Sequence, residues 1–237
     1  EVVPPPRVAV VPTGDELVEP DRVPGPGQIR NSNAVMLQAL ALAAGAEAEA
    51  LAIAPDDPGR LGTALDRGLA ADVLLITGGV SAGNRDLVPE TLERLGVGRV
   101  FHKIRLKPGK PLWFGTGPGR GDRPGALVFG LPGNPVSGIV GFLLFVRPAL
   151  RVLAAQGTGV AETVALPLAL PFTHRGDRPT YHPARVSTRD GVTALEPLAW
   201  AGSADLKTVA QADGFAIFAA GDRTYQQGEI VGFLPLG

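Results

Sequence analysis

Three glycine-containing segments of this 237-residue chain follow short apolar runs and carry polar side chains. They are PTGDEL at residues 12–17, GGVSAGNRD at 78–86 and LPGNPVS at 131–137. Glycine lets backbone N–H groups come close to an anion, so the second segment could hold a phosphate group. The structural alternative is a tight turn in which Asp86 caps the next helix, and the glycines alone leave the two interpretations even.

The third segment predicts the start of a helix, with Asn134 as its cap and Pro135 in its first turn. A capped helix N-terminus still attracts anions, because its free N–H groups and the positive end of its dipole both point towards the bound anion. The structural interpretation and the binding interpretation are therefore compatible here.

Positive charges gather in the segment FHKIRLKPGK at residues 101–110. We expect an extended strand in which Lys103, Arg105 and Lys107 share one face, with Lys110 in the following turn. Basic residues on an exposed strand are most often simply solvated by water. The functional alternative is a bound oxyanion, which would offset the repulsion between their positive charges.

Acidic residues offer a site for a hard cation. Asp15, Glu16 and Asp86 are the carboxylates nearest to the glycine segments, and carboxylates suit Mg²⁺ when it also binds phosphate. Capping and surface solvation are the more frequent use of isolated carboxylates. The three histidines lack the spacing of metal ligands, and the chain contains no cysteine, so a zinc site is not expected.

The elements that must position these residues alternate along the first two thirds of the chain. Apolar runs predict strands at residues 7–11, 48–54, 72–77, 97–106, 111–116 and 126–130, and helices at 32–44, 58–70, 87–95 and 134–155. This pattern predicts an α/β fold with a doubly wound, mostly parallel sheet, in residues 1–156. Short β-favouring runs then predict a small β-barrel in residues 157–237.

Composition narrows the partners and the location. A formal net charge of −1 gives no general reason to bind nucleic acid. The apolar run at 136–146 is shorter than the roughly 20 residues of a membrane span, so a buried helix and no membrane are expected. Without a signal-peptide pattern at residue 1, a cytoplasmic location is expected.

Taken together and in order, several segments resemble the molybdopterin molybdenumtransferases, the family of MoeA-type proteins and the gephyrin E domain. They are PTGDEL, QIRNSN (28–33), TGGVSAG (77–83), KPGKP (107–111), GLPGNPVS (130–137), RPTY (178–181), and Gly202-Ser203 with DGF (213–215). The likeness covers nearly the whole chain and corresponds to the C-terminal half of such proteins. The family normally carries two further N-terminal domains, one of which reaches the partner subunit's active site.

The resemblance implies a molybdenum insertase, in which molybdate enters the dithiolene of adenylylated molybdopterin, the adenylate bond is cleaved and AMP is released, with Mg²⁺ assisting. It implies that Asp86 and Glu16 act in catalysis and hold the metal. The implied molybdate-binding residues are Lys107, Lys110, Ser137, Arg178 and Ser203. The implied substrate-binding residues are Thr13, Gly14, Asp15, Ser32, Asn33, Gly78, Gly79, Ser81, Gly83, Lys103, Pro132, Gly133, Asn134 and Pro135.

Two other functions stay open from the sequence. Arg85-Asp86 resembles the related molybdopterin adenylyltransferases, although LPGNPVS and the β-rich tail favour the insertase. A non-catalytic binding or scaffold module is the alternative from another class. The resemblance also implies a homodimer and an adenylyltransferase as a possible partner.

Overall fold

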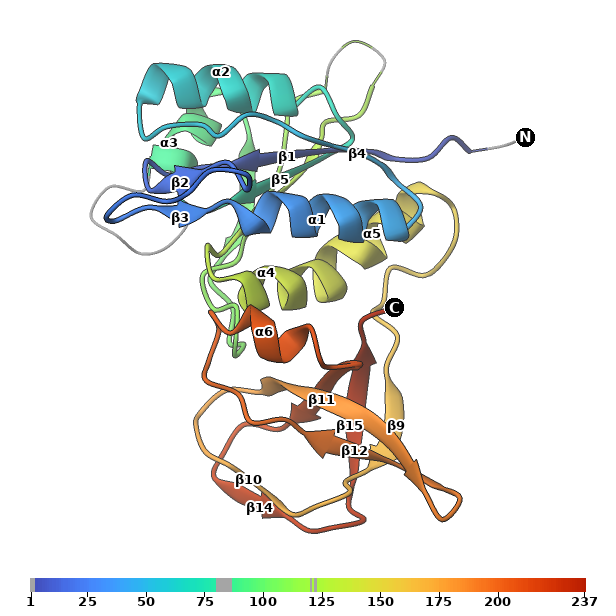
Figure 1. The fold of residues 1–237 in the computed structure, drawn as a ribbon. Helices are drawn as coiled ribbons and strands as arrows, with labels where there is room; N and C mark the ends of the chain where they lie inside the picture. Colours follow the sequence, from blue (N-terminus) through green and yellow to red (C-terminus); the bar gives the residue numbers. More distant parts are fainter. Residues whose placement is uncertain (1–2, 80–86, 120, 122) are drawn as a thin grey trace.

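The computed structural model describes residues 3–79, 87–119, 121 and 123–237. Two β-sheets of different kinds dominate it, one above the other in Figure 1. We call residues 3–153, which hold the larger sheet and its helices, the α/β domain, and residues 164–237, which hold the second sheet, the β domain.

The larger sheet has six strands in the order β4-β1-β5-β8-β7-β6. They are β1 (Arg7–Pro12), β4 (Glu47–Ala50), β5 (Val73–Thr77), β6 (Gly98–His102), β7 (Trp113–Thr116) and β8 (Leu127–Leu131). The first four in the order are parallel, while β7 runs antiparallel to both β8 and β6. Strands β1, β5, β8 and β6 therefore all end at the same edge of the sheet, where an open α/β sheet binds its ligands.

Helices cover both faces of this sheet (Figure 1). Helices α2 (Pro58–Gly68) and α3 (Leu87–Arg94) pack on one face, and α1 (Ser32–Ala43), α4 (Pro135–Gly141) and α5 (Arg147–Leu153) lie on the other. Alternate residues of β1 enter the two cores: Val8 and Val10 contact the α1 side, Ala9 and Val11 the α2 side. The doubly wound, mostly parallel fold is confirmed.

Helices α4 and α5 are joined by the π-helical segment Phe142–Val146 into one stretch of 19 residues, Pro135–Leu153. Within the described residues, this is the one stretch long and apolar enough to cross a membrane. The long helix predicted at residues 134–155 is thus confirmed, although its central turn is π-helical. Its most apolar window is 61% buried inside the protein, as in the core helix of a folded domain.

The β domain is a curled antiparallel sheet in the order β12-β11-β13-β15-β9. Its strands are β9 (Val164–Pro167), β11 (Thr180–Arg189), β12 (Val192–Pro197), β13 (Gly214–Phe218) and β15 (Ile230–Pro235). A bridge between Leu168 and Leu195 connects the two edges, so the sheet closes on a core that includes Phe218 and Phe233. Strands β10 (Phe172–His174) and β14 (Arg223–Tyr225) form a separate pair, and the short helix α6 (Leu206–Val209) faces α4.

One local prediction was wrong, and two further features were not predicted. Strand β6 ends at His102, because Lys103 has a positive φ of 68°, so Lys103, Arg105 and Lys107 do not share a strand face. Strand β11 is ten residues long and runs through Pro183, whose carbonyl accepts a hydrogen bond from Leu198.

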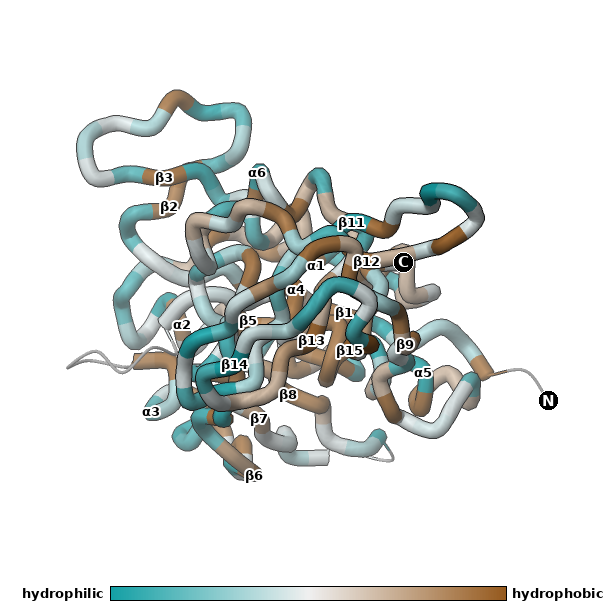
Figure 2. The backbone as a smooth tube through the Cα atoms, turned by 90° about the horizontal axis from the view of Figure 1, so that it is seen from below, coloured by the Kyte–Doolittle hydropathy of each residue, from teal (hydrophilic) through white to brown (hydrophobic). Residues whose placement is uncertain are grey.

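The third difference is an arm that the sequence analysis did not predict. Strands β2 (Leu17–Val18) and β3 (Ile29–Arg30) pair in parallel, and the loop between them projects from the α/β domain (Figure 2). Strands of two residues are too short for a periodic sequence signal.

Candidate functional site

A cavity of about 780 Å³ lies at the junction of the α/β domain and the β domain. The cations and hydroxyls predicted to bind molybdate all contribute to its wall, namely Lys107, Lys110, Ser137, Arg178 and Ser203. They come from the loop after β6, the first turn of α4, the segment just before β11 and the loop before α6. The fold therefore brings together five side chains from a stretch of nearly 100 residues of the sequence.

The loop after β6 is held in place by backbone hydrogen bonds. Lys103 N–H donates to Leu112 O, and Ile104 N–H donates to Lys110 O, both at 2.9 Å. Gly109 brings this turn against α4, since a Cβ added there would lie 3.8 Å from Ser137 O. Lys107 and Lys110 are exposed at their side chains, whereas Ser137 is almost fully buried at 4% exposure.

Arg178 reaches the cavity from the β domain. Its guanidinium donates to Leu106 O at 3.0 Å and lies 3.6 Å from the carboxylate of Asp177. A guanidinium has five N–H donors, so further donors stay free for an anion.

Ser203 connects the loop before α6 to the start of α4. Asn134 Nδ2 donates to Ser203 Oγ at 2.8 Å, and Val136 N–H donates to Ser203 O at 3.0 Å. Asn134 does occupy the N-cap position, but its side chain makes no capping hydrogen bond, contrary to expectation. The β domain, through the Ser203 carbonyl, satisfies a free N–H group of this helix instead.

A smaller cavity of about 270 Å³ adjoins the first. Both cavities are lined by Glu16, Ile29, Gly133 and Asn134, so they form one continuous depression. The smaller one also contains predicted substrate-binding residues, which are Thr13, Ser32, Asn33, Gly78 and Pro135. Pro132 lines the larger cavity only.

Asn33 joins two of the loops around the smaller cavity. Its Nδ2 donates to Thr77 Oγ1 at 2.9 Å, at the end of β5, and to Gly133 O at 2.7 Å, after β8. Glycine is required beside it, since Gly78 has a φ of +93° and a Cβ there would lie 2.5 Å from Thr13 O. The loops after β1, β5 and β8 are thereby packed directly against one another.

Several predicted residues lie elsewhere. Gly14, Asp15, Gly79 and Lys103 line neither cavity. Asp15 accepts a hydrogen bond from Asp56 N–H at 3.0 Å, and Gly14 makes room for the carboxylate of Glu16. Ser81, Gly83 and Asp86 fall outside the described residues.

Negative charge accumulates on the Glu16 side of the site. Burial, followed by the nearby charges of Asp15 and Glu16, raises the pKa of the Asp56 carboxyl above its usual value. No group of three or more Asp, Glu, His or Cys suited to a metal ion occurs within the described part of the chain. Glu16 alone supplies a carboxylate to both cavities, among the residues described.

Several residues that line the cavities were not among the predicted site residues, and two of them carry large or charged side chains. Trp200 lines the larger cavity and packs edge-to-face on His182, with ring centroids 5.3 Å apart. Arg30, from the β2–β3 arm, lines the smaller one. Arg30 belongs to the QIRNSN segment, which is part of the family resemblance, but the resemblance implied no role for Arg30. No local sequence pattern indicates that Trp200 lines a cavity.

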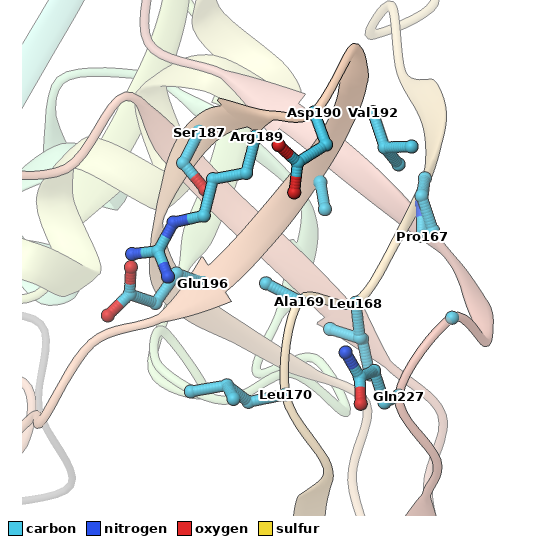
Figure 3. A pocket seen from close by; sticks show the side chains of 12 residues that line it. Pro167, Leu168, Ala169, Leu170, Ser187, Arg189, Asp190, Val192, Glu196 and Gln227 are labelled. Atoms are coloured by element: carbon cyan, nitrogen blue, oxygen red, sulfur yellow. The ribbon is translucent and has the colours of Figure 1, made fainter.

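A separate cavity of about 470 Å³ lies in the β domain, between β11–β12 and the segment 167–170 (Figure 3). Its wall is largely apolar, and its cation Arg189 lies beside the carboxylates of Asp190 and Glu196. This excess of carboxylates does not favour an anion, whereas the cavity between the domains has three cations and one carboxylate, that of Glu16.

The fold and the adjoining cavities define a doubly wound α/β protein whose larger cavity is completed by a β domain. Residues 9–152 match the family model described as a probable molybdopterin binding domain, and residues 165–236 match the MoeA C-terminal region (domain IV). The chain therefore belongs to the molybdopterin-binding family, with the domain pair of MoeA-type molybdopterin molybdenumtransferases.

Similar proteins agree with this assignment. The chain is 34% identical to a molybdopterin molybdenumtransferase of Nostoc sp., over 98% of the chain and 53% of that protein. It is 33% identical to the one of Bacillus subtilis, over 97% and 52%. A crystal structure of a molybdopterin biosynthesis MoeA protein from Pyrococcus horikosii matches with a TM-score of 0.78 and 27% identity, over 98% of the chain and 55% of that protein. The chain thus spans about half the length of the relatives it matches.

Proposed function

We propose that this chain provides the molybdate-insertion site of a molybdopterin molybdenumtransferase. Molybdate enters the dithiolene of adenylylated molybdopterin, and the adenylate bond is cleaved with release of AMP. The observation that carries this proposal is the convergence of Lys107, Lys110, Ser137, Arg178 and Ser203 on one cavity of about 780 Å³. Three cations and two hydroxyls suit a small dianion, and the names of the relatives support molybdate as that dianion.

The two cavities divide the substrates between them in this proposal. The pterin and its phosphates occupy the smaller cavity, against Thr13, Ser32 and Asn33, while molybdate occupies the larger one. Because the cavities share Gly133 and Asn134, the two reactants meet without leaving the depression. Fixed positive charge at the reaction point stabilises the negative charge that develops as the phosphoanhydride breaks.

The carboxylate of Glu16, which lines both cavities, is a type of ligand that Mg²⁺ prefers. Mg²⁺ is commonly bound by one or two carboxylates together with substrate phosphates, and Glu16 borders both cavities. We propose Glu16 and Asp86 as its ligands; when bound there, the ion would neutralise charge on the phosphoanhydride. Glu16 would hold the ion beside both cavities.

Release of AMP from adenylylated molybdopterin, measured with and without molybdate, tests the function. The insertase predicts release that depends on molybdate and is lost in a Lys107→Ala, Lys110→Ala double variant. Pterin binding with no AMP release in the presence of molybdate and Mg²⁺ would instead support a binding module. AMP release is specific to the insertase, because an adenylyltransferase forms the adenylate; the match of residues 165–236 to the MoeA C-terminal region supports the former.

A homodimer, a molybdopterin adenylyltransferase as partner and a cytoplasmic location stay predictions from the family resemblance. The solution mass of the chain, alone and mixed with an adenylyltransferase, tests the first two.

A further inference from the structure

The contact between Asn134 and Ser203 crosses from the α/β domain to the β domain at the wall of the larger cavity. Asn134 Nδ2 is the donor and Ser203 Oγ the acceptor, at 2.8 Å. The Ser203 backbone is fixed separately, by the hydrogen bond from Val136 N–H to Ser203 O. The serine is thus held at both its carbonyl and its hydroxyl.

A serine hydroxyl has one hydrogen to donate and two lone pairs that accept. Since Ser203 Oγ accepts from Asn134, its own hydrogen is directed away from that amide. Among the hydrogen bonds of the described residues, Ser203 Oγ donates none. The hydrogen is therefore available to a ligand in the cavity that both residues line.

We propose that Asn134 is a positioning residue that fixes Ser203 as a hydrogen-bond donor and so favours oxyanions that carry no proton. The inference rests on the proposed function, because it takes the larger cavity as the molybdate site. Lysine and arginine side chains have donors only, so Lys107, Lys110 and Arg178 already favour an anion that only accepts. A preset Ser203 adds a fourth such donor.

The chemistry of the anions gives the selectivity. Near neutral pH, molybdate has four oxygens that only accept, whereas inorganic phosphate carries at least one P–OH that must donate. A freely rotating serine hydroxyl can serve either anion, by donating or by accepting. Holding the hydroxyl as a donor favours molybdate, because its hydrogen is directed into the cavity and Asn134 occupies one of its two lone pairs, which leaves a single lone pair to accept from a P–OH.

The test is equilibrium binding of molybdate and of inorganic phosphate to the purified chain and to Asn134→Ala, Ser203→Ala and the double variant. We expect Asn134→Ala to weaken molybdate binding about tenfold, which is about 1.4 kcal/mol, and phosphate binding much less. In the S203A background, Asn134→Ala should change molybdate binding less than about twofold, because the two residues act through one hydrogen bond. Equal losses for both anions, or the same loss in both backgrounds, would overturn the proposal.

Asn134→Asp keeps the test decisive if the alanine variant does not fold. The carboxylate has the same shape but accepts, so it draws the Ser203 hydrogen away from the cavity. Its added charge repels anions whether or not Ser203 is present, so only the difference between the Ser203 and S203A backgrounds reports the hydroxyl. If Asn134→Asp has the same effect in both backgrounds, the proposal is overturned. If the unmodified chain does not bind molybdate at all, the proposed function fails instead, which separates the two outcomes.

Discussion

Lys107 of the α/β domain is paired with Thr180 of strand β11 in the β domain. Lys107 N–H donates to Pro179 O at 3.0 Å, and Lys107 O accepts from Tyr181 N–H at 2.8 Å. The backbone of a cavity lysine is thus fixed by the second domain, which also supplies Arg178 and Ser203. The cluster of cations around the larger cavity is therefore a property of the domain pair, because long-range contacts position these side chains.

The first prediction compares three lysines of one loop. Lys107→Ala and Lys110→Ala should each weaken molybdate binding roughly 10- to 100-fold, because each removes a charged donor from the cavity. Lys103→Ala is the matched control, since Lys103 is exposed like the other two lysines but lines neither cavity. Isothermal titration with molybdate checks this, and an equal effect of Lys103→Ala would show that overall charge, not the cavity, governs binding.

The second prediction concerns the glycines where the loops after β5 and β8 meet. Gly78→Ala should lower the free energy of unfolding by more than about 2 kcal/mol, because its φ is +93° and the new Cβ would lie 2.5 Å from Thr13 O. Gly133→Ala should change it by less than about 0.5 kcal/mol, since the nearest atom to its Cβ is 3.9 Å away. Denaturant unfolding of both variants decides, and similar losses would contradict the packing described for these loops.

The third prediction concerns pH. Burial lowers the pKa of His182 from its ordinary value of 6.5, and the charge of Lys107 lowers it further, against the hydrogen bond to Leu198 O, which raises it. The unfolded state then takes up a proton more readily than the folded state, so acid favours unfolding. The contribution of His182 should be constant above about pH 6.5 and fall as the pH is lowered from there towards the folded-state pKa.

His182→Gln isolates that contribution, because it removes the titrating ring. Unfolding free energies of the two proteins between pH 7.5 and 5 should show a steeper decline for the unmodified chain. Parallel curves would mean that His182 is protonated equally well when folded.

The sequence predicts the sheet and the edge where its loops meet, and the physical reason is local. Strand β5 is a continuous apolar run and helix α1 begins after Asn31, whose side chain accepts from Ala34 N–H, so neighbouring residues determine both elements. The rule for parallel sheets then places the loops after β1, β5 and β8 together.

The positions of the cavity cations could not be predicted in the same way. Lys103 ends the expected strand because its φ is positive. The backbone of Lys107 is positioned by a bridge to Thr180, 73 positions away in the sequence. Trp200 enters the cavity through packing on His182, which no local pattern encodes. The positions of these side chains depend on contacts between the two domains, so only the structure or the family resemblance could indicate them.

The fourth prediction concerns Asn33, which joins the ends of two strands across the smaller cavity. Its amide donates to both Thr77 Oγ1 and Gly133 O, so Asn33→Ala releases the loop after β8 from the loop after β5. We expect a loss of about 1 kcal/mol in unfolding free energy and a larger loss in affinity for adenylylated molybdopterin than for molybdate.

Gln38→Ala provides the control on the same helix. Gln38 Nε2 also donates to a backbone carbonyl, that of Ala48, at 3.0 Å, and the residue lines neither cavity. Its loss should cost about as much stability, roughly 1 kcal/mol, and leave both affinities unchanged. Titration of each variant with the two substrates, together with denaturant unfolding, separates the effects. If Asn33→Ala weakens the pterin no more than Gln38→Ala does, Asn33 stabilises the fold without shaping the pterin cavity.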